Sequence, residues 1–323
     1  MSLQTKWKAA ILGHAVGDAL GVPVEFRPRT YLKKHPVSGM QGYGTYHLPK
    51  GTWSDDTSMT LATIDSLQHG FDARGIMDRF CAWANDAAYT PYEEVFDMGM
   101  ATRQALLRYL SGQAEPVQCG GAGEMDNGNG SLMRILPGIF YCKARFPGER
   151  FFSEGIKLLH SLSDLTHAHP RSEMACGIYA CVASALLDCR CKESVFEGLT
   201  EAKQVYQADS RFQPEMVHFE RLMQPGFANL PEAKIRSSGY VVDTLEAAIW
   251  CLLTTDNYSD CVLKAVNLGE DTDTVAAVAG GLAGMLYGLH AIPEEWLAVL
   301  AKRQWIEELC DRFSANVFNG TAD

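Results

Sequence analysis

Residues 269–284 read GEDTDTVAAVAGGLAG. The second part of this stretch, from Val275 to Gly284, contains only small or apolar residues, which predicts a helix buried against close neighbours. Asp271 and Asp273 stand directly before that helix, so burial of the helix brings two carboxylates into the interior. Residues two apart point to different sides of a regular helix, so these carboxylates converge only where the chain turns into one.

A second acidic stretch, GTWSDDTSMTLA at 51–62, has the same layout, with Ser54, Asp55 and Asp56 before an apolar run. Such a cluster alone is equally typical of a helix N-cap, where the helix dipole favours negative charge. Carboxylates gathered in a partly buried pocket repel one another unless a cation cancels their charge. Carboxylate and hydroxyl oxygens suit Mg2+ or Mn2+ better than Zn2+. Two such clusters therefore predict a site for one or two metal ions.

The whole chain has the composition of a globular protein, with 323 residues, 47% hydrophobic and 21% charged. No linker or low-complexity block divides it, so we expect one domain over residues 1–323. Strand-like alternation is nearly absent, which predicts an all-α fold. Polar, glycine-rich stretches at 36–54, 118–131 and 235–242 are the expected functional loops. Apolar residues recur at helical spacing in 8–20, 55–69, 73–87, 95–111, 150–163, 171–188, 243–254, 273–289 and 294–313.

Charge and hydropathy exclude several classes of protein. The 28 Lys and Arg residues against 39 Asp and Glu give a net charge of -11, which argues against a nucleic acid partner. No run approaches the roughly 20 apolar residues of a membrane span, and the N-terminus lacks the layout of a signal peptide. We therefore expect a soluble, cytoplasmic protein. Its ten cysteines lie scattered through apolar runs and are expected to be reduced core thiols.

The following stretches lie in order across positions 13–288: GHAVGDALG at 13–21 with Glu25-Phe26 after it, GTWSDDTSMTLA at 51–62, FDMG at 96–99, NGNGSLMR at 127–134, THAHP at 166–170, GYVVDT at 239–244 and EDTDTVAAVAGGLAGMLYG at 270–288. Together they resemble the ADP-ribosylglycohydrolases, close to the bacterial branch that includes the dinitrogenase reductase activating glycohydrolase. The departures are small: Ser54 stands where relatives often have Thr, and Glu270 where many have Gly. Neither change removes a ligand oxygen.

The resemblance implies a compact orthogonal helical bundle with two Mg2+ ions, or Mn2+, at the base of a cleft. Carried over by position, the ligands of one metal are Ser54, Asp55 and Asp56. Asp271 and Thr274 bind the other metal, and Asp273 bridges the two. These residues coincide with the acidic clusters identified above from charge alone.

The resemblance also implies the substrate, which is ADP-ribose joined to a protein side chain and cleaved at C1 of the distal ribose to release ADP-ribose. The loop Asn127, Gly128, Asn129, Gly130 and Ser131 would cradle the diphosphate with backbone N–H groups. His167 would reach a phosphate or the distal ribose. The adenosine end would be lined by Gly239, Tyr240 and Val241.

Two acids compete for the proton-transfer role in the implied reaction. In the bacterial branch the aspartate of the Phe-Asp-x-Gly stretch lies at the reacting ribose, which favours Asp97. In a relative branch that acts on serine-linked ADP-ribose, the acid after the first Gly-Asp motif does this work, and its counterpart is Glu25. Alternatively, Glu25 is a rim acid paired with Arg27 or Arg29, and Asp97 is a surface acid at a helix start.

Taken together, the sequence predicts a metal-dependent hydrolase that cleaves the N-glycosidic bond of ADP-ribosylarginine. Hydrolysis of serine-linked or other ADP-ribose conjugates, a non-catalytic ADP-ribose binder and a two-metal phosphohydrolase are the alternatives. His14 and His160 are expected to be structural histidines. Asp18 is expected to orient a neighbouring loop rather than to bind metal.

Overall fold

The computed structural model describes residues 2–189 and 191–319, and within them it contains helices and loops but no β-sheet. This confirms the all-α fold class. None of the described helices is long and apolar enough to cross a membrane. The helices are α1 (Leu3–Gly21), α2 (Arg29–Leu32), α3 (Asp55–Leu67), α4 (Ala73–Asp86), α5 (Met100–Leu110), α6 (Leu136–Arg145), α7 (Ile156–Asp164), α8 (Pro170–Asp188), α9 (Ser194–Gln207), α10 (Val241–Leu253), α11 (Tyr258–Asn267), α12 (Thr272–Tyr287), α13 (Glu294–Leu297) and α14 (Arg303–Phe313).

Two of the predicted helical segments need correction. The segment 95–111 becomes helical only at Met100, because residues 95–99 are not helical and Asp97 has a φ of 60°. The segment 294–313 forms two helices, α13 and α14, interrupted before Lys302, whose φ of 51° no α-helix accommodates. The periodicity analysis did not predict helices α2, α6, α9 and α11.

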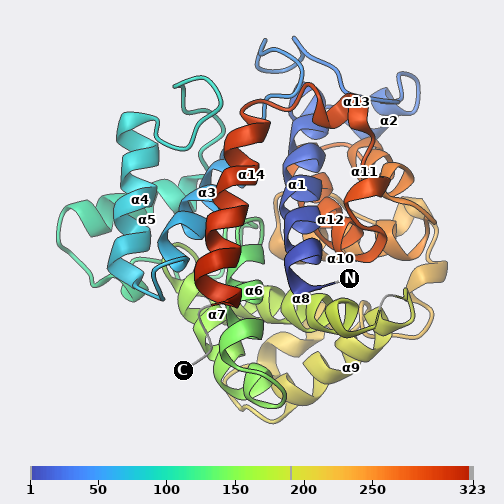
Figure 1. Cartoon of the computed structure of the whole chain (residues 1–323). Helices are drawn as coiled ribbons and strands as arrows, with labels where there is room; N and C mark the ends of the chain where they lie inside the picture. Colours follow the sequence, from blue (N-terminus) through green and yellow to red (C-terminus); the bar gives the residue numbers. More distant parts are fainter. Residues whose placement is uncertain (1, 190, 320–323) are drawn as a thin grey trace.

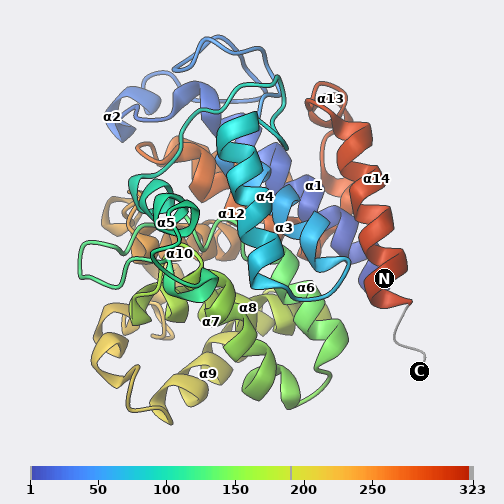
Figure 2. The same cartoon turned by 90° about the vertical axis from the view of Figure 1, so that its left-hand side faces the viewer.

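Helices α1 and α12 run antiparallel and side by side through the centre of the molecule (Figures 1 and 2). In Figure 1, α8 lies horizontally below them, whereas α1 and α14 run from top to bottom of the view. The backbones of α1 and α12 approach so closely that a Cβ on the α1 glycines would collide with α12. Such a Cβ would lie 2.5 Å from Gly280 O at Gly13, 2.1 Å from Ala276 O at Gly17 and 2.3 Å from Asp273 N at Gly21.

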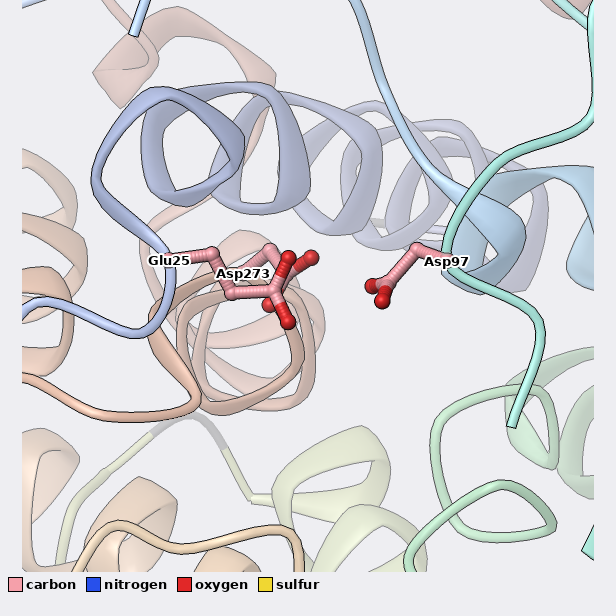
Figure 3. A group of neighbouring side chains, drawn as sticks. All are labelled: Glu25, Asp97 and Asp273. Carbon is pink, nitrogen blue, oxygen red and sulfur yellow. The ribbon is translucent and has the colours of Figure 1, made fainter. Parts of the chain in front are cut away.

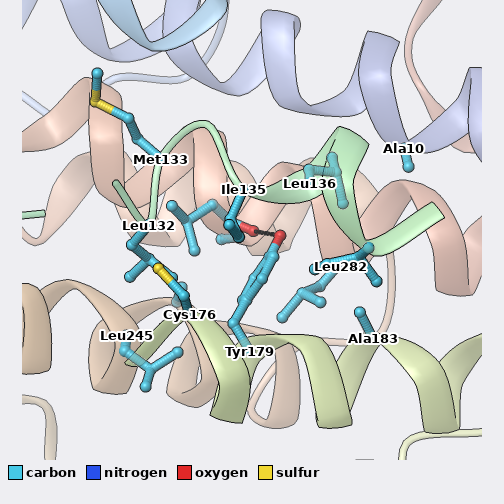
Figure 4. Packing of buried hydrophobic residues seen from close by; sticks show 14 of the residues in the cluster. Ala10, Leu132, Met133, Ile135, Leu136, Cys176, Tyr179, Ala183, Leu245 and Leu282 are labelled. Carbon is cyan, nitrogen blue, oxygen red and sulfur yellow. Dashed lines mark hydrogen bonds between the residues drawn. The ribbon is translucent and has the colours of Figure 1, made fainter. Parts of the chain in front are cut away.

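Tyrosines from neighbouring helices support this crossing. The Tyr258 hydroxyl of α11 donates to Gly13 O at 2.6 Å, and the Tyr179 hydroxyl of α8 donates to Val278 O at 3.0 Å. Both tyrosines are buried, and Figure 4 shows Tyr179 among aliphatic side chains such as Leu136 and Leu282. A buried hydroxyl needs a partner, so each tyrosine has one favourable position against the helix that it contacts. The tyrosines thereby help to hold the two helices in register.

We predict that Gly17→Ala destabilises the protein by about 2–3 kcal/mol or more, because the new methyl group meets backbone that can only move with its helix. The matched control is Gly226→Ala, where an added Cβ has no atom within 4 Å and φ is -86°. Urea-induced unfolding of both variants measures the difference. Equal stabilities of the two variants would contradict the close approach of α1 and α12.

Candidate active site

The C-terminal end of α1 holds both acidic clusters. At one side Gly21 touches Asp273, and the Thr272 hydroxyl donates to Gly21 O at 2.8 Å. At the other side Asp18 accepts the backbone N–H groups of Ser54 at 2.9 Å and of Thr57 at 3.0 Å, and the Thr57 hydroxyl at 2.6 Å. This confirms that Asp18 orients a neighbouring loop. Burial raises the pKa of Asp18 to about 6, although these hydrogen bonds oppose the shift.

The N-terminal ends of α3 and α12 therefore meet. Ser54 is the N-cap of α3, and its hydroxyl lies 3.2 Å from Asp56 Oδ2. The Thr274 hydroxyl, from the first turn of α12, donates to the same Asp56 oxygen at 3.1 Å. Two residues more than two hundred positions apart in the chain thus share one carboxylate. The meeting of the two clusters, expected from their composition, is present in the structure.

Two loop carboxylates join this group (Figure 3). Carboxylate oxygens of Glu25, Asp97 and Asp273 all lie within 4.8 Å of one another. Glu25 is only 4% exposed, so it is not a rim acid. The Arg29 guanidinium donates instead to backbone carbonyls, including Leu268 O at 2.7 Å. Asp97 is half-buried and faces the other two acids rather than solvent.

The electrostatics of this group are unfavourable without a cation. Burial, and next the charges of neighbouring carboxylates, raise the pKa of Asp55, Asp56 and Asp273 well above the usual range. For Glu25, burial and then the charge of Asp97 raise the pKa to about 9. Asp56 Oδ1 and Asp273 Oδ2 are buried without a hydrogen-bond partner among the described residues. An acidic, oxygen-rich and incompletely satisfied site of this kind fits a bound divalent cation.

Tyr46 joins the acidic group although no sequence pattern indicates it. Its hydroxyl lies 2.7 Å from Glu25 Oε2 and 2.9 Å from Asp97 Oδ1, and its ring packs on Phe96 at 4.8 Å. One hydroxyl carries one proton, so it links the two acids either by a shared hydrogen bond or with one carboxyl protonated. Tyr46 lies in the non-helical stretch 36–54, where no local pattern distinguishes it from Tyr43.

A cleft of about 330 Å3 opens above the acidic group. Ser54, Asp56 and Asp273 do not line it and lie in the buried layer with the lining acids. Met100, Thr102, Met125 and Met133 also line it, although none of them was a candidate site residue. The candidate residues that line it are Glu25, Asp55, Asp97, Gly128, Asn129, Gly130, His167, Gly239, Asp271 and Thr274.

Two loops form one wall of the cleft and are joined by backbone hydrogen bonds. Asn129 N–H donates to Gly239 O, and Val241 N–H donates to Asn127 O, both at 3.0 Å. The Asn129 side chain donates to Asp271 Oδ2 at 2.7 Å, which ties this wall to the start of α12. The loop over residues 127–131 is therefore positioned relative to the acidic group.

His167 lies behind this loop. A Cβ at Gly130 would lie 2.8 Å from its ring, which explains why the loop contains glycine there. Its Nδ1 lies 2.8 Å from the Thr166 hydroxyl, which accepts a hydrogen bond from the buried Arg134. Burial, and next the charge of Arg134, lower the pKa of His167 to about 3, so the ring is neutral.

The remaining candidate binding residues lie beside the cleft rather than in its lining. The Asn127 side chain donates to Glu124 O, and the Ser131 hydroxyl lies against Ser163 in the interior. Val241 is buried at the start of α10, and Tyr240 is half-buried with Arg171 above its ring. Their contribution to binding stays a prediction that depends on their backbone groups or on movement of the loop.

A family model described as ADP-ribosylglycohydrolase matches residues 1–322. The chain belongs to the ADP-ribosylglycohydrolase family. It is 33% identical to "ADP-ribosylarginine hydrolase Tri1" of Serratia proteamaculans, over 95% of this chain and 78% of that one. It is 31% identical to "ADP-ribosyl-[dinitrogen reductase] glycohydrolase" of Rhodospirillum rubrum, over 93% and 91%. A solved structure titled "ADP-ribosylglycohydrolase-related protein complex" superposes with a TM-score of 0.80 at 33% identity, covering 98% of this chain and 99% of that chain.

These similarities confirm the family, the all-α fold and the hydrolase activity expected from the sequence. They leave the roles of single residues as predictions. They do not favour a non-catalytic binder, because the curated relatives reported above are named as hydrolases.

We predict that Asp273→Asn raises the melting temperature of the metal-free protein by about 2 °C or more at pH 8.5, because one buried and unsatisfied charge is removed. Mn2+ or Mg2+ should raise the melting temperature of the wild-type protein, because they bind only the folded state, and should not raise that of the Asp273→Asn variant. Asp86→Asn, at an exposed carboxylate, is the matched control and should change neither quantity. Differential scanning fluorimetry with EDTA and with each cation measures both.

The stability of the metal-free protein should also depend on pH, and the raised pKa of Glu25 decides the direction. An acid whose pKa is raised in the folded state binds more protons folded than unfolded, so stability is lost as pH rises through the folded value of about 9. The metal-free wild type should therefore melt higher at pH 7 than at pH 8.5. A higher melting temperature at pH 8.5 would contradict the pKa shift.

We further predict that Tyr46→Phe lowers kcat on an ADP-ribosylated substrate by about tenfold and changes KM by less than about twofold, because the lost hydroxyl holds acids rather than substrate. Tyr43→Phe is the control, since Tyr43 is 71% exposed. Steady-state assays of released ADP-ribose distinguish the two variants. A Tyr46 variant with wild-type kcat would show that the bridge has no part in turnover.

Proposed function

We propose that this hydrolase releases ADP-ribose from arginine side chains of proteins, with two divalent cations, Mg2+ or Mn2+, as cofactors and residues 1–323 acting as one domain. The observation that carries the proposal is the buried carboxylate group at the floor of the cleft with Asp97 at its edge. The names of relatives that are 31–35% identical, two of them ADP-ribosylarginine hydrolases, support the arginine linkage.

The ligand assignment is the one that the family resemblance implies. Ser54, Asp55 and Asp56 would hold one cation, Asp271 and Thr274 the other, and Asp273 would lie between them. The shared Asp56–Thr274 contact and the unpartnered oxygens of Asp56 and Asp273 support this assignment. Bound cations would bind the ribose hydroxyls and activate a water molecule.

The chain's own residues would bind ADP-ribose and transfer a proton. Backbone N–H groups near Gly128 and Gly130 would contact the diphosphate, with the neutral His167 ring behind them. In the net reaction the bond between C1 of the distal ribose and the guanidine nitrogen breaks, and a bond from C1 to the water oxygen forms. Asp97 would accept the water proton and return a proton to the departing nitrogen.

A serine linkage is the second candidate because Glu25, like Asp97, has a carboxylate oxygen within 4.8 Å of one of Asp273. Tyr46 contacts both acids, so the static geometry assigns the proton to neither. The linkage and the acid are therefore tested together.

We predict metal-dependent release of free ADP-ribose from an arginine-linked peptide, and none from the matched serine-linked peptide, measured by mass spectrometry with Mg2+, with Mn2+ and with EDTA. Asp97→Asn should lower kcat by about a hundredfold or more, since general acid–base groups contribute about 10²–10⁴. Glu25→Gln should lower kcat by a smaller factor than Asp97→Asn does. Release from the serine peptide, with the larger loss at Glu25, would replace the proposal by its alternative. AMP and ribose phosphate as products would reveal a phosphohydrolase.

A further inference from the structure

Helix α5 carries an apolar face that no other part of the described chain covers. Met100, Leu107 and Leu110 are 67%, 58% and 55% exposed. With Arg103 they follow the spacing 3, 4, 3, which places them on one face of the helix. Thr102, Ala105 and Leu106 of the same helix are buried and already supply the packing that holds the helix in place, with Leu106 also reaching the groove described next. Stability of the fold therefore gives no reason for the exposed face to be apolar.

This face borders a groove of about 450 Å3 beside the cleft. Leu107, Leu110 and Arg103 form one side of the groove, and Val95, Phe96 and Met98 of the preceding loop line it as well. In Figure 2, α5 lies at the surface of the molecule, next to α4.

The groove and the cleft share one lining residue. Asp97 lines both cavities, and Met100, the first residue of α5, lines the cleft while it begins the exposed face. A carboxylate that acts on the bond between ribose and guanidine has the ribose on one side and the departing group on the other. If ADP-ribose occupies the cleft, the protein that carries the arginine leaves across Asp97, where the groove begins.

The positive charge of Arg103 in the groove favours an acidic residue in the segment that binds there. The Arg103 guanidinium has no acidic partner among the residues that the structure describes, although the chain as a whole has a net charge of -11. A segment with apolar side chains and one acidic residue would complement both the apolar face and Arg103.

We propose that the exposed face of α5 and its groove bind the segment of the substrate protein next to the modified arginine, and that they prefer apolar residues together with an acidic one. This inference rests on the proposed hydrolysis of arginine-linked ADP-ribose. From Met100 to Leu110 the face is about 15 Å long, because an α-helix rises about 1.5 Å per residue. An extended peptide covers that length with about five residues.

The test compares three substrates: free ADP-ribosylarginine, a peptide whose modified arginine is flanked on both sides by five residues of leucine, valine and one glutamate, and a matched peptide with serine and glycine flanks. For the wild type we expect kcat/KM on the apolar peptide to exceed that on the serine–glycine peptide by about tenfold or more. Leu107→Glu and Leu110→Glu should remove this preference and leave hydrolysis of free ADP-ribosylarginine unchanged. Val217→Glu, at a residue 60% exposed and outside the residues that line the groove and the cleft, is the control and should retain it.

A charge exchange tests Arg103 separately. Arg103→Glu should prefer a peptide in which lysine replaces the flanking glutamate, whereas the wild type prefers the glutamate peptide. A variant that keeps the wild-type preference would overturn the role of Arg103.

The outcomes separate this inference from the proposed function. Failure of the wild type to hydrolyse free ADP-ribosylarginine would contradict the proposed function itself. Hydrolysis of all three substrates without a preference, or an equal loss on all three in the leucine variants, would overturn only the docking role. Light scattering provides one further check, because a wild-type dimer lost in Leu107→Glu would assign this face to a second copy of the chain and overturn the proposal.

Discussion

Helices α1 and α12 cross with backbone against backbone, and the positions of the acids at the starts of α3 and α12 depend on that contact. With glycines at positions 13 and 17, no flexible side chain lies between the helices to absorb a shift along their axes. The end of α1 is therefore fixed beside the start of α12, and Asp18 on α1 in turn holds the start of α3. Metal sites tolerate deviations of only a few tenths of an ångström in ligand distance. A contact between backbones is suited to that requirement because it cannot repack.

The site built on this contact works against the stability of the protein. Several carboxylates lie within one buried region, and two of their oxygens have no partner among the described residues. Around the group, three residues other than glycine adopt positive φ: Phe26 at 63°, Asp97 at 60° and Glu270 at 64°. Each such residue stores strain that the rest of the fold must offset. The extensive apolar core, in which most of α1, α8 and α12 is buried, provides that stabilisation.

The sequence predicts features that depend on a pattern within a few neighbouring residues, and it does not predict features that depend on contacts between residues far apart in the chain. The acid clusters were predictable because Ser54–Asp56 and Asp271–Thr274 each stand at a helix start, which is a pattern within a few residues. The segment 95–99 was assigned to a helix because Val95, Phe96 and Met98 are apolar, yet these residues line a groove from a non-helical segment. Periodicity cannot distinguish the two cases. Tyr46 was missed because its significance lies in contacts with Glu25 and Asp97, 21 and 51 positions away.

The candidate metal ligands and the candidate proton-transfer residues lie on different kinds of structural element. The ligand candidates Asp55, Asp56 and Asp273 lie in the first turns of helices in the core, whereas Glu25, Tyr46 and Asp97 come from loops outside α1, α3 and α12. Substitution in these loops can change which acid approaches the ribose without moving the ligand group, since none of the three loops contributes to the α1–α12 contact. Asp97 in addition joins the cleft to the groove along α5. The same loop residue can therefore link the choice of proton donor to the choice of protein substrate. This arrangement would allow members of one family to share a metal-binding centre and differ in the linkage that they cleave.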